Sequence, residues 1–426
     1  MSCISHNRNR IRTVSAGSEH PVSFLYFIVV WAFLFFAGCA AGPLRDARNA
    51  FYSNRPLDAV SALSDAKPFS RQDSLLVSME KGLILHHLGR YEESVREFLK
   101  ASKQMALQDI IRVGEQTLSL VTTDWVTEYK GEYSEQLWVH TYLMMNFLIL
   151  RKHDSALVEA KKALKVLEKH PKPLSGDYFT RSLIALCYEN VGDINDAYIE
   201  YRKLAKLMRD PSPVASPLYR LGMRLGFSDE VRQYKKFIPK STLSLLADRS
   251  SAELILFVGL GTGPVKVSDN IVAPPSIRLS FPSYSERSTG SAEVTVLDSS
   301  RRLPASVITT DMNAVARSSL KDRAGKIIAK ETARAAIKEA MTRAVERKND
   351  EIVGILLRAA LFLMEEADTR CWQTLPASLK LLRVPVSRAC NIKVVIRSPG
   401  GVDEITLPDL KVYPGQRVYR SLRVNY

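Results

Sequence analysis

The sequence predicts an α+β protein, in which an all-α superhelix of repeated helix pairs is followed by a domain with antiparallel strands and two central helices. Three observations predict this fold. A helix-pair pattern recurs between residues 78 and 207, short β-rich runs begin at residue 252, and two helical patterns interrupt them between residues 312 and 365. The predicted division is a leader at 1–38, the helical domain at 39–240, and the α+β domain at 250–426, which ends in a small antiparallel β unit.

The leader contains an apolar run from Val22 to Ala37, which is 16 residues long. Because a membrane-spanning helix needs about 20 residues, this run is short for an anchor and typical of a secretory signal. Arg8, Arg10 and Arg12 lie upstream, on the side that stays cytoplasmic.

The apolar run ends in FAGC, residues 36–39. This tetrapeptide resembles the lipobox of bacterial lipoproteins, in which the cysteine is lipidated and the chain is cut just before it. Cys39 is therefore the expected lipidation site, and Ala40 after it implies delivery to the outer membrane, on its periplasmic face. An uncleaved or ordinary signal is the alternative.

The helical domain shows a repeat with small residues where two helices touch and an aromatic residue on the second helix. In "SMEKGLILHHLGRYEESVREFLKASK", Gly82 is the expected contact residue, Gly89 the turn and Phe98 the aromatic. Similar patterns begin at residues 138 and 178, with turns at Arg151 and Gly192. The pattern is that of tetratricopeptide repeats, which are helix pairs of about 34 residues. It extends over residues 44 to 238, with an insertion around residues 105 to 135.

Repeats of this kind stack into a superhelix with a concave groove that holds a peptide or a partner helix. Tyr142, Met145 and Phe147 are the candidate partner-binding residues of that groove, although the same helical spacing also fits core positions. The domain that follows is expected to present a second contact or to dock on the groove.

The net charge of +15 points to a polyanionic partner. In a periplasmic protein, anionic lipid or glycan is expected in that role rather than nucleic acid. Cys371 and Cys390 lack a CxxC or zinc-like spacing, and whether they pair is left open. No metal or cofactor is expected.

The β-rich part opens with Gly259, Gly261 and Gly263, which superficially match a phosphate-binding loop. Such a loop needs a helix directly after the glycines, whereas Pro264 and a strand-like run follow here, so a turn between strands is predicted. Asp311 is the expected N-cap of the first long helix.

That helix carries a basic stripe at four-residue spacing, which is either a solvated face or a surface for an acidic partner or membrane headgroups. The stripe consists of Lys326, Lys330, Arg334 and Lys338. The next helix, from Ile352 to Glu365, is nearly all apolar, and we expect it to be buried, with a docking surface as the alternative.

The segment "EADTRCWQTLPASLKLLRVPV" contains Asp368, Arg370, Trp372 and Pro376 after a helix and before a strand. These residues resemble a motif of proteobacterial tetratricopeptide-repeat lipoproteins of unassigned function. The resemblance implies association with lipoproteins that activate peptidoglycan synthases. From the residues alone we expect an Asp368–Arg370 pair, Trp372 buried on the sheet, and Pro376 ending the loop.

An enzyme is not expected, because no histidine follows His170 and the chain lacks HExxH, GxSxG and a Walker-type lysine loop. The sequence favours a lipid-anchored periplasmic scaffold that binds protein partners in cell-envelope biogenesis, through regulation of peptidoglycan synthases. An accessory lipoprotein of outer-membrane assembly or export is the alternative. A cell-wall hydrolase would need convergent carboxylates that the sequence does not indicate.

Overall fold

The computed structural model describes residues 42–64, 71–111, 128–247, 252–273, 277–288, 290–348, 351–363, 365–386, 390–410 and 413–426. Residues Pro43–Tyr426 form one compact unit. The predicted signal peptide and Cys39 lie outside the described residues. Within those residues, no helix is both long and apolar enough to cross a membrane.

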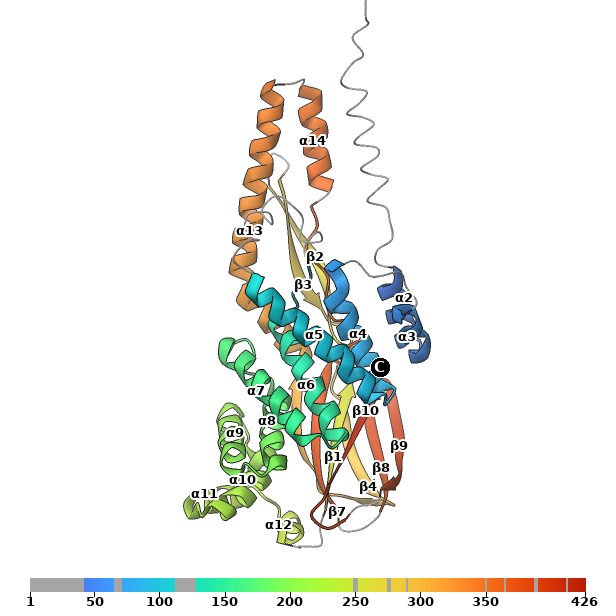
Figure 1. Ribbon diagram of the computed structural model, residues 1–426, viewed down its shortest axis with the longest axis vertical. Helices are drawn as coiled ribbons and strands as arrows, with labels where there is room; N and C mark the ends of the chain where they lie inside the picture. Colours follow the sequence, from blue (N-terminus) through green and yellow to red (C-terminus); the bar gives the residue numbers. More distant parts are fainter. Residues whose placement is uncertain are drawn as a thin grey trace, which may run out of the picture. The chain divides into compact units, whose positions relative to one another are not determined.

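The first half of the unit is a series of antiparallel helix pairs, as predicted (Figure 1). The pairs are α4 with α5, α6 with α7, α8 with α9, and α10 with α11. The helices are α2 (Gly42–Tyr52), α3 (Pro56–Ser64), α4 (Ser74–His87), α5 (Tyr91–Ile111), α6 (Tyr133–Ile149), α7 (His153–Lys169), α8 (Tyr178–Val191), α9 (Ile194–Leu207), α10 (Ser212–Leu225), α11 (Ser228–Lys235) and α12 (Lys240–Ala247), with a 3₁₀ turn at Arg71–Asp73.

The turns inside these pairs share one backbone conformation. Gly89, Arg151, Gly192 and Gly226 have φ values of 73°, 57°, 84° and 77°, all in the left-handed region that ends a helix. The predicted equivalence of Gly89, Arg151 and Gly192 is therefore confirmed. Gly82 is also confirmed as a contact residue, because a Cβ atom there would lie 2.8 Å from the Phe98 ring.

The second half contains two four-stranded sheets and a two-stranded ribbon. Sheet 1 has the order β10–β1–β7–β6, sheet 2 has the order β5–β4–β8–β9, and β2 pairs with β3. The strands are β1 (Ala252–Leu260), β2 (Val265–Ala273), β3 (Ile277–Ser285), β4 (Glu293–Asp298), β5 (Arg301–Arg302), β6 (Ser306–Asp311), β7 (Ser378–Val386), β8 (Cys390–Ser398), β9 (Gly401–Leu410) and β10 (Arg417–Val424).

One strand of the predicted C-terminal β unit belongs elsewhere. β8 and β9 pair antiparallel as expected, but β10 leaves them and pairs in parallel with β1, with Val258 opposite Leu422. The local alternation of polar and apolar residues predicts a strand but does not identify its partner.

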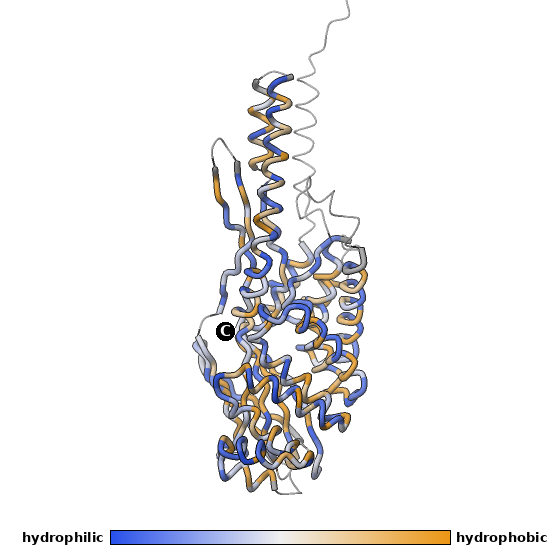
Figure 2. Tube along the Cα trace, turned by 90° about the vertical axis from the view of Figure 1, so that its left-hand side faces the viewer, coloured by the Kyte–Doolittle hydropathy of each residue, from blue (hydrophilic) through white to orange (hydrophobic). Residues whose placement is uncertain are grey.

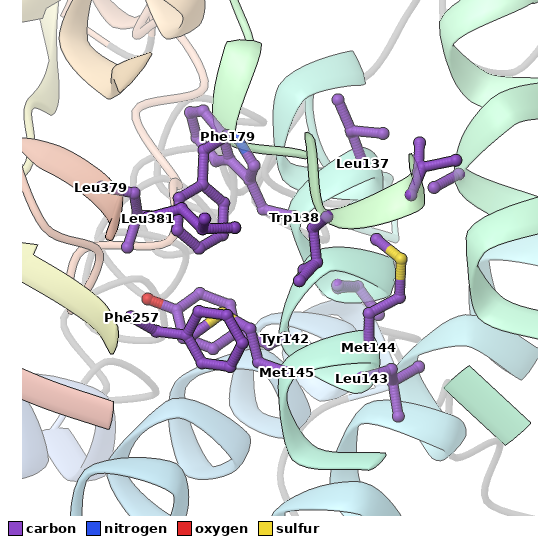
Figure 3. Packing of buried hydrophobic residues seen from close by; sticks show 14 of the residues in the cluster. Leu137, Trp138, Tyr142, Leu143, Met144, Met145, Phe179, Phe257, Leu379 and Leu381 are labelled. Atoms are coloured by element: carbon purple, nitrogen blue, oxygen red, sulfur yellow. The ribbon is translucent and has the colours of Figure 1, made fainter. Parts of the chain in front are cut away.

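β1 is apolar from Leu254 to Leu260 because both of its faces are buried there. Ile255 and Phe257 pack against the helices, whereas Leu254, Leu256 and Val258 face sheet 2. Figure 3 shows Phe257 of β1 and Leu381 of β7 facing Phe179 and Tyr142 of the helices. The change from helix to strand falls at the predicted boundary, between 247 and 252, yet both parts contribute to one core. The division into two domains stays a prediction.

The two helices predicted to be central form a projecting hairpin instead. α13 (Met312–Lys348) begins after Asp311, which caps it by accepting a hydrogen bond from the Ala314 N–H at 3.0 Å. α14 (Glu351–Leu363) returns along α13, and the pair extends beyond the sheets beside β2 and β3 (Figures 1 and 2). We call α13 from residue 326 onward, together with α14, the arm. The expected burial of α14 is wrong, because Ile355 and Leu356 are 57% and 53% exposed.

Candidate functional site

The inner side of the helix pairs is the predicted partner-binding groove, and the chain fills it with its own C-terminal half. The first helix of each of three pairs, α4, α6 and α8, contacts strands of sheet 1. Tyr142, Met145 and Phe147 are 3%, 1% and 8% exposed and belong to the shared core. They are therefore core residues and not an open partner-binding surface.

The groove also holds an irregular segment, residues 367–377, which we call the groove segment. Its Trp372 is buried, with ring centroids 5.7 Å from Phe98 and 5.8 Å from Tyr142. Its indole N–H donates to the Thr374 hydroxyl at 3.2 Å. Trp372 is buried as expected, in a core that holds Leu379 and Leu381 of sheet 1 and also these aromatic residues of the helices.

A buried carboxylate of α4 holds the backbone of the groove segment. Glu80 accepts hydrogen bonds from the backbone N–H groups of Gln373 at 3.0 Å and Thr374 at 3.1 Å. Arg48 of α2 donates to the same carboxylate at 2.8 Å and to the Cys371 carbonyl at 2.9 Å. The backbone of the groove segment has no strand or helix partners for its hydrogen bonds. Side chains of the groove make those hydrogen bonds instead.

A second carboxylate, from α6, holds the preceding residue. Glu135 accepts from the Trp372 N–H at 2.8 Å and from the Tyr129 hydroxyl. Burial raises the pKa of Glu135, although the charge of Lys266 and the Trp372 N–H oppose that rise. The groove segment therefore lies across helices α4 and α6 much as a bound peptide would. Carboxylates of the two helices accept hydrogen bonds from its backbone N–H groups.

The predicted pair between Asp368 and Arg370 is confirmed. The Arg370 Nε and Nη2 atoms lie 2.9 and 2.8 Å from the two Asp368 carboxylate oxygens, and Asp73 lies 3.3 Å from Nη1. Pro376 precedes β7, at the predicted end of the loop. The motif residues thus anchor a segment inside the protein.

Cys371 is a free thiol, buried beside Lys266, whose backbone N–H donates to the sulfur at 3.3 Å. Burial raises its pKa to about 11, and the charge of Glu135 adds to that rise. Such a thiol is protonated at neutral pH and is a poor nucleophile. The side chain of Cys390 lies outside the described part of the chain.

Two buried ionic clusters join the halves. In the first, Glu132 lies 2.6 Å from both Lys266 and Arg323. Burial opposes its ionisation, but the two cations prevail and lower its pKa to about 2.

In the second cluster, Glu189 of α8 and Glu253 of β1 face Arg220, Arg383 and Arg417. Burial disfavours both carboxylates, yet the arginines lower the pKa of Glu189 to about 2 and that of Glu253 well below its usual range. Both glutamates are therefore ionised at neutral pH.

The predicted basic stripe is not a continuous cationic surface. Arg334 is only 2% exposed and lies 2.8 Å from Glu331, and Lys338 is paired with Glu365. Lys326 is exposed and Lys330 is half-buried. The four-residue spacing identified one helix face, but it did not show that α14 and residue 365 return along it.

Sequence reasoning missed the residues that organise this region, above all Glu80, Glu135 and Glu189. A glutamate in a helical repeat is ordinarily assigned to the solvent face, and nothing local distinguishes these three. Among the described residues, no group of three or more His, Cys, Asp or Glu is placed to hold a metal ion.

No protein-family model and no curated protein matches the chain. Among solved structures, MamA AMB-1 gives a TM-score of 0.33 at 15% identity, covering 46% of this chain and 88% of that one. MamA from Desulfovibrio magneticus RS-1 gives 0.33 at 16% identity, with coverages of 47% and 92%. The apo form of RapI gives 0.35 at 11% identity, with coverages of 50% and 72%. TM-scores this low do not assign a role to this chain.

Proposed function

We propose that this protein is a non-catalytic, lipid-anchored scaffold on the periplasmic face of the outer membrane, and that its arm binds a protein partner in cell-envelope biogenesis. The observation that carries the proposal is that the groove is filled by the chain itself, while the arm exposes apolar and basic side chains. Because the groove segment and sheet 1 occupy the inner side of the repeats, a partner needs another surface.

The arm offers an apolar face. Ile355 and Leu356 of α14 are more than half exposed, as is Ile328 of α13, while Met341 is 50% exposed. α14 packs against α13 along one side. Its other sides have few contacts with the strands. Exposed aliphatic side chains such as the adjacent Ile355 and Leu356 are typical of a protein-binding surface.

The charge of the arm defines the partner further. The arm, residues 326–348 and 351–363, carries eight lysines and arginines but four acidic residues. Three of those acids are already paired within the hairpin: Glu331 with Arg334, Glu339 with Arg343 and Arg358, and Glu346 with Arg358. The uncompensated charge is therefore positive, and the partner surface that fits is apolar with acidic residues around it.

The lipobox-like leader supports location in the envelope, and regulation of peptidoglycan synthases is the process we favour. The alternative is an accessory role in outer-membrane assembly or export. The two differ in the first defect that follows loss of the arm surface.

The test uses the full chain carrying Ile355→Asp together with Leu356→Asp, and an equally exposed control, Val158→Asp on α7, whose side chain is 53% exposed. We expect the arm variant to reduce incorporation of labelled peptidoglycan precursor to the level of a deletion strain, with the control unchanged. Loss of outer-membrane proteins with normal wall synthesis would favour the alternative. Normal behaviour of the arm variant in both assays would exclude the arm as the partner surface.

A further inference from the structure

A cleft of about 690 Å³ lies away from the groove segment, between the helices around α10 and α12 and the strands β4 to β6. This volume lies within the range of small-molecule sites, roughly 300–1,000 Å³. We use the name arginine cleft for it, after its lining residues Arg220, Arg301, Arg302 and Arg383.

The floor of the arginine cleft has an excess of positive charge. Glu253 and Arg383 line it, and behind them the second ionic cluster sets three arginines against two ionised glutamates. The cluster thus has one more guanidinium group than carboxylates, and its partly buried position makes that charge act more strongly than in bulk water.

The entrance adds cationic groups. Arg301 and Arg302 form the short strand β5, and both are exposed. Arg302 lies 3.2 Å from Glu293, whereas Arg301 makes no ion pair within the described residues. A guanidinium held at the mouth of a positively charged cleft is suited to bind a carboxylate or a phosphate through paired hydrogen bonds.

Two polar atoms of the lining lack partners. The Nε atom of Arg220 and the hydroxyl of Thr295 are buried and make no hydrogen bond with any described residue. Buried polar groups are ordinarily satisfied by protein, water or ligand, and these two atoms remain unpaired behind the cleft surface without being exposed in it.

Apolar and small hydroxyl side chains make up much of the remaining lining, among them Leu303 and Val307 from the strands, Pro217 of α10, and Ser216, Ser241 and Thr242. A purely ionic ligand would make little use of Leu303 and Val307, which are only half-buried at the cleft. We propose that the arginine cleft binds a small molecule with an oxyanion at one end and an apolar group at the other. The oxyanion pairs with the arginines, and the apolar group packs on the valine and leucine side chains.

The test is calorimetric titration of the full chain with phenyl phosphate, benzoate and benzyl alcohol. The first two join an oxyanion to an apolar ring, and the third is the uncharged counterpart. We expect saturable binding of at least one anion and none of benzyl alcohol. Binding of phenyl phosphate alone or of benzoate alone identifies the oxyanion as phosphate or carboxylate.

Three variants keep the test specific. Arg301→Gln removes an exposed charge, so it leaves the fold intact and is expected to weaken anion binding by about tenfold or more. Ala305→Trp, at an exposed lining position, is expected to block entry. Arg397→Gln, an exposed arginine of β8 outside the cleft, is the control and should leave binding unchanged.

The proposal is overturned if neither anion binds, if benzyl alcohol binds equally well, or if Arg301→Gln and Ala305→Trp both bind like the unaltered chain. Equal weakening by Arg397→Gln would show a general charge effect and would overturn it as well. The arm plays no part in this experiment, so its outcome is independent of the proposed scaffold function.

Discussion

Glu80 and Glu135 each satisfy backbone N–H groups of a segment that lies more than 230 positions away in the chain. A buried carboxylate is costly unless it is hydrogen-bonded, and here each one has several donors. The same bonds give the groove segment its position, because an irregular backbone has no ladder of its own.

Replacing Glu80 by Ala is expected to lower the free energy of unfolding by about 3 kcal/mol, because it leaves two backbone N–H groups and the Arg48 guanidinium without their acceptor. Chemical denaturation followed by circular dichroism measures the change. Glu92→Ala, at an exposed position of the neighbouring helix α5, should change stability by no more than about 0.5 kcal/mol. Equal effects of the two substitutions would contradict the role given to Glu80.

Glu132 makes stability depend on pH in a known direction. Its pKa in the folded protein is about 2, below the value of about 4.3 expected for an unfolded chain. A carboxylate whose pKa is lower in the folded protein stabilises it fully when the pH is above the pKa of the unfolded chain. This stabilisation is lost as the pH falls to the pKa of the folded protein. The contribution is on the order of 3 kcal/mol.

We therefore expect the unaltered protein to lose stability between about pH 5 and pH 2, and Glu132→Gln to flatten that dependence while lowering stability at neutral pH. The free energy of unfolding at pH 7, 5, 4 and 3 gives the comparison. Glu189 and Glu253 act in the same direction, so the slope should decrease and not vanish. Identical slopes would show that Glu132 is not held ionised by Lys266 and Arg323.

Among the elements, the helix pairs were predictable because their signals are local. A glycine or another residue in the left-handed conformation ends each first helix, and Gly82 allows α4 to approach Phe98 of α5. The start of the β-rich part at residue 252 and both long helices were likewise predicted from short-range patterns and caps.

Other features depend on contacts between distant segments and were missed. The parallel pairing of β10 with β1, the return of α14 along the basic stripe and the filling of the groove are all of this kind. Tyr142 illustrates the reason, because an aromatic residue at its spacing looks the same whether a foreign peptide or Trp372 covers it.

Two glycines of the helices should respond oppositely to the same substitution. Gly82→Ala places a methyl group 2.8 Å from the Phe98 ring, and the overpacking should cost about 1–3 kcal/mol. Gly325→Ala, inside α13 with open space around it, should stabilise the protein by up to about 1 kcal/mol through helix propensity. Thermal unfolding of both variants is the measurement, and a stabilised Gly82→Ala would contradict the close helix contact.

For the whole molecule, the arrangement separates two tasks that a repeat protein often gives to one surface. The inner side of the helix pairs stabilises the chain itself, because it buries sheet 1 and the groove segment. The arm projects beyond the sheets and, under the proposed function, is the surface that meets a partner. Binding at the arm requires no displacement of the groove segment.

This division is the central claim, and site-specific photo-cross-linking in cells tests it most directly. A photoreactive residue is placed at Ile355 or Met341 of the arm, and for comparison at Val158 of α7, all at least half exposed. We expect one envelope protein to be cross-linked from both arm positions and not from position 158. Cross-linking of that protein from position 158 alone, or from no arm position, would contradict the account.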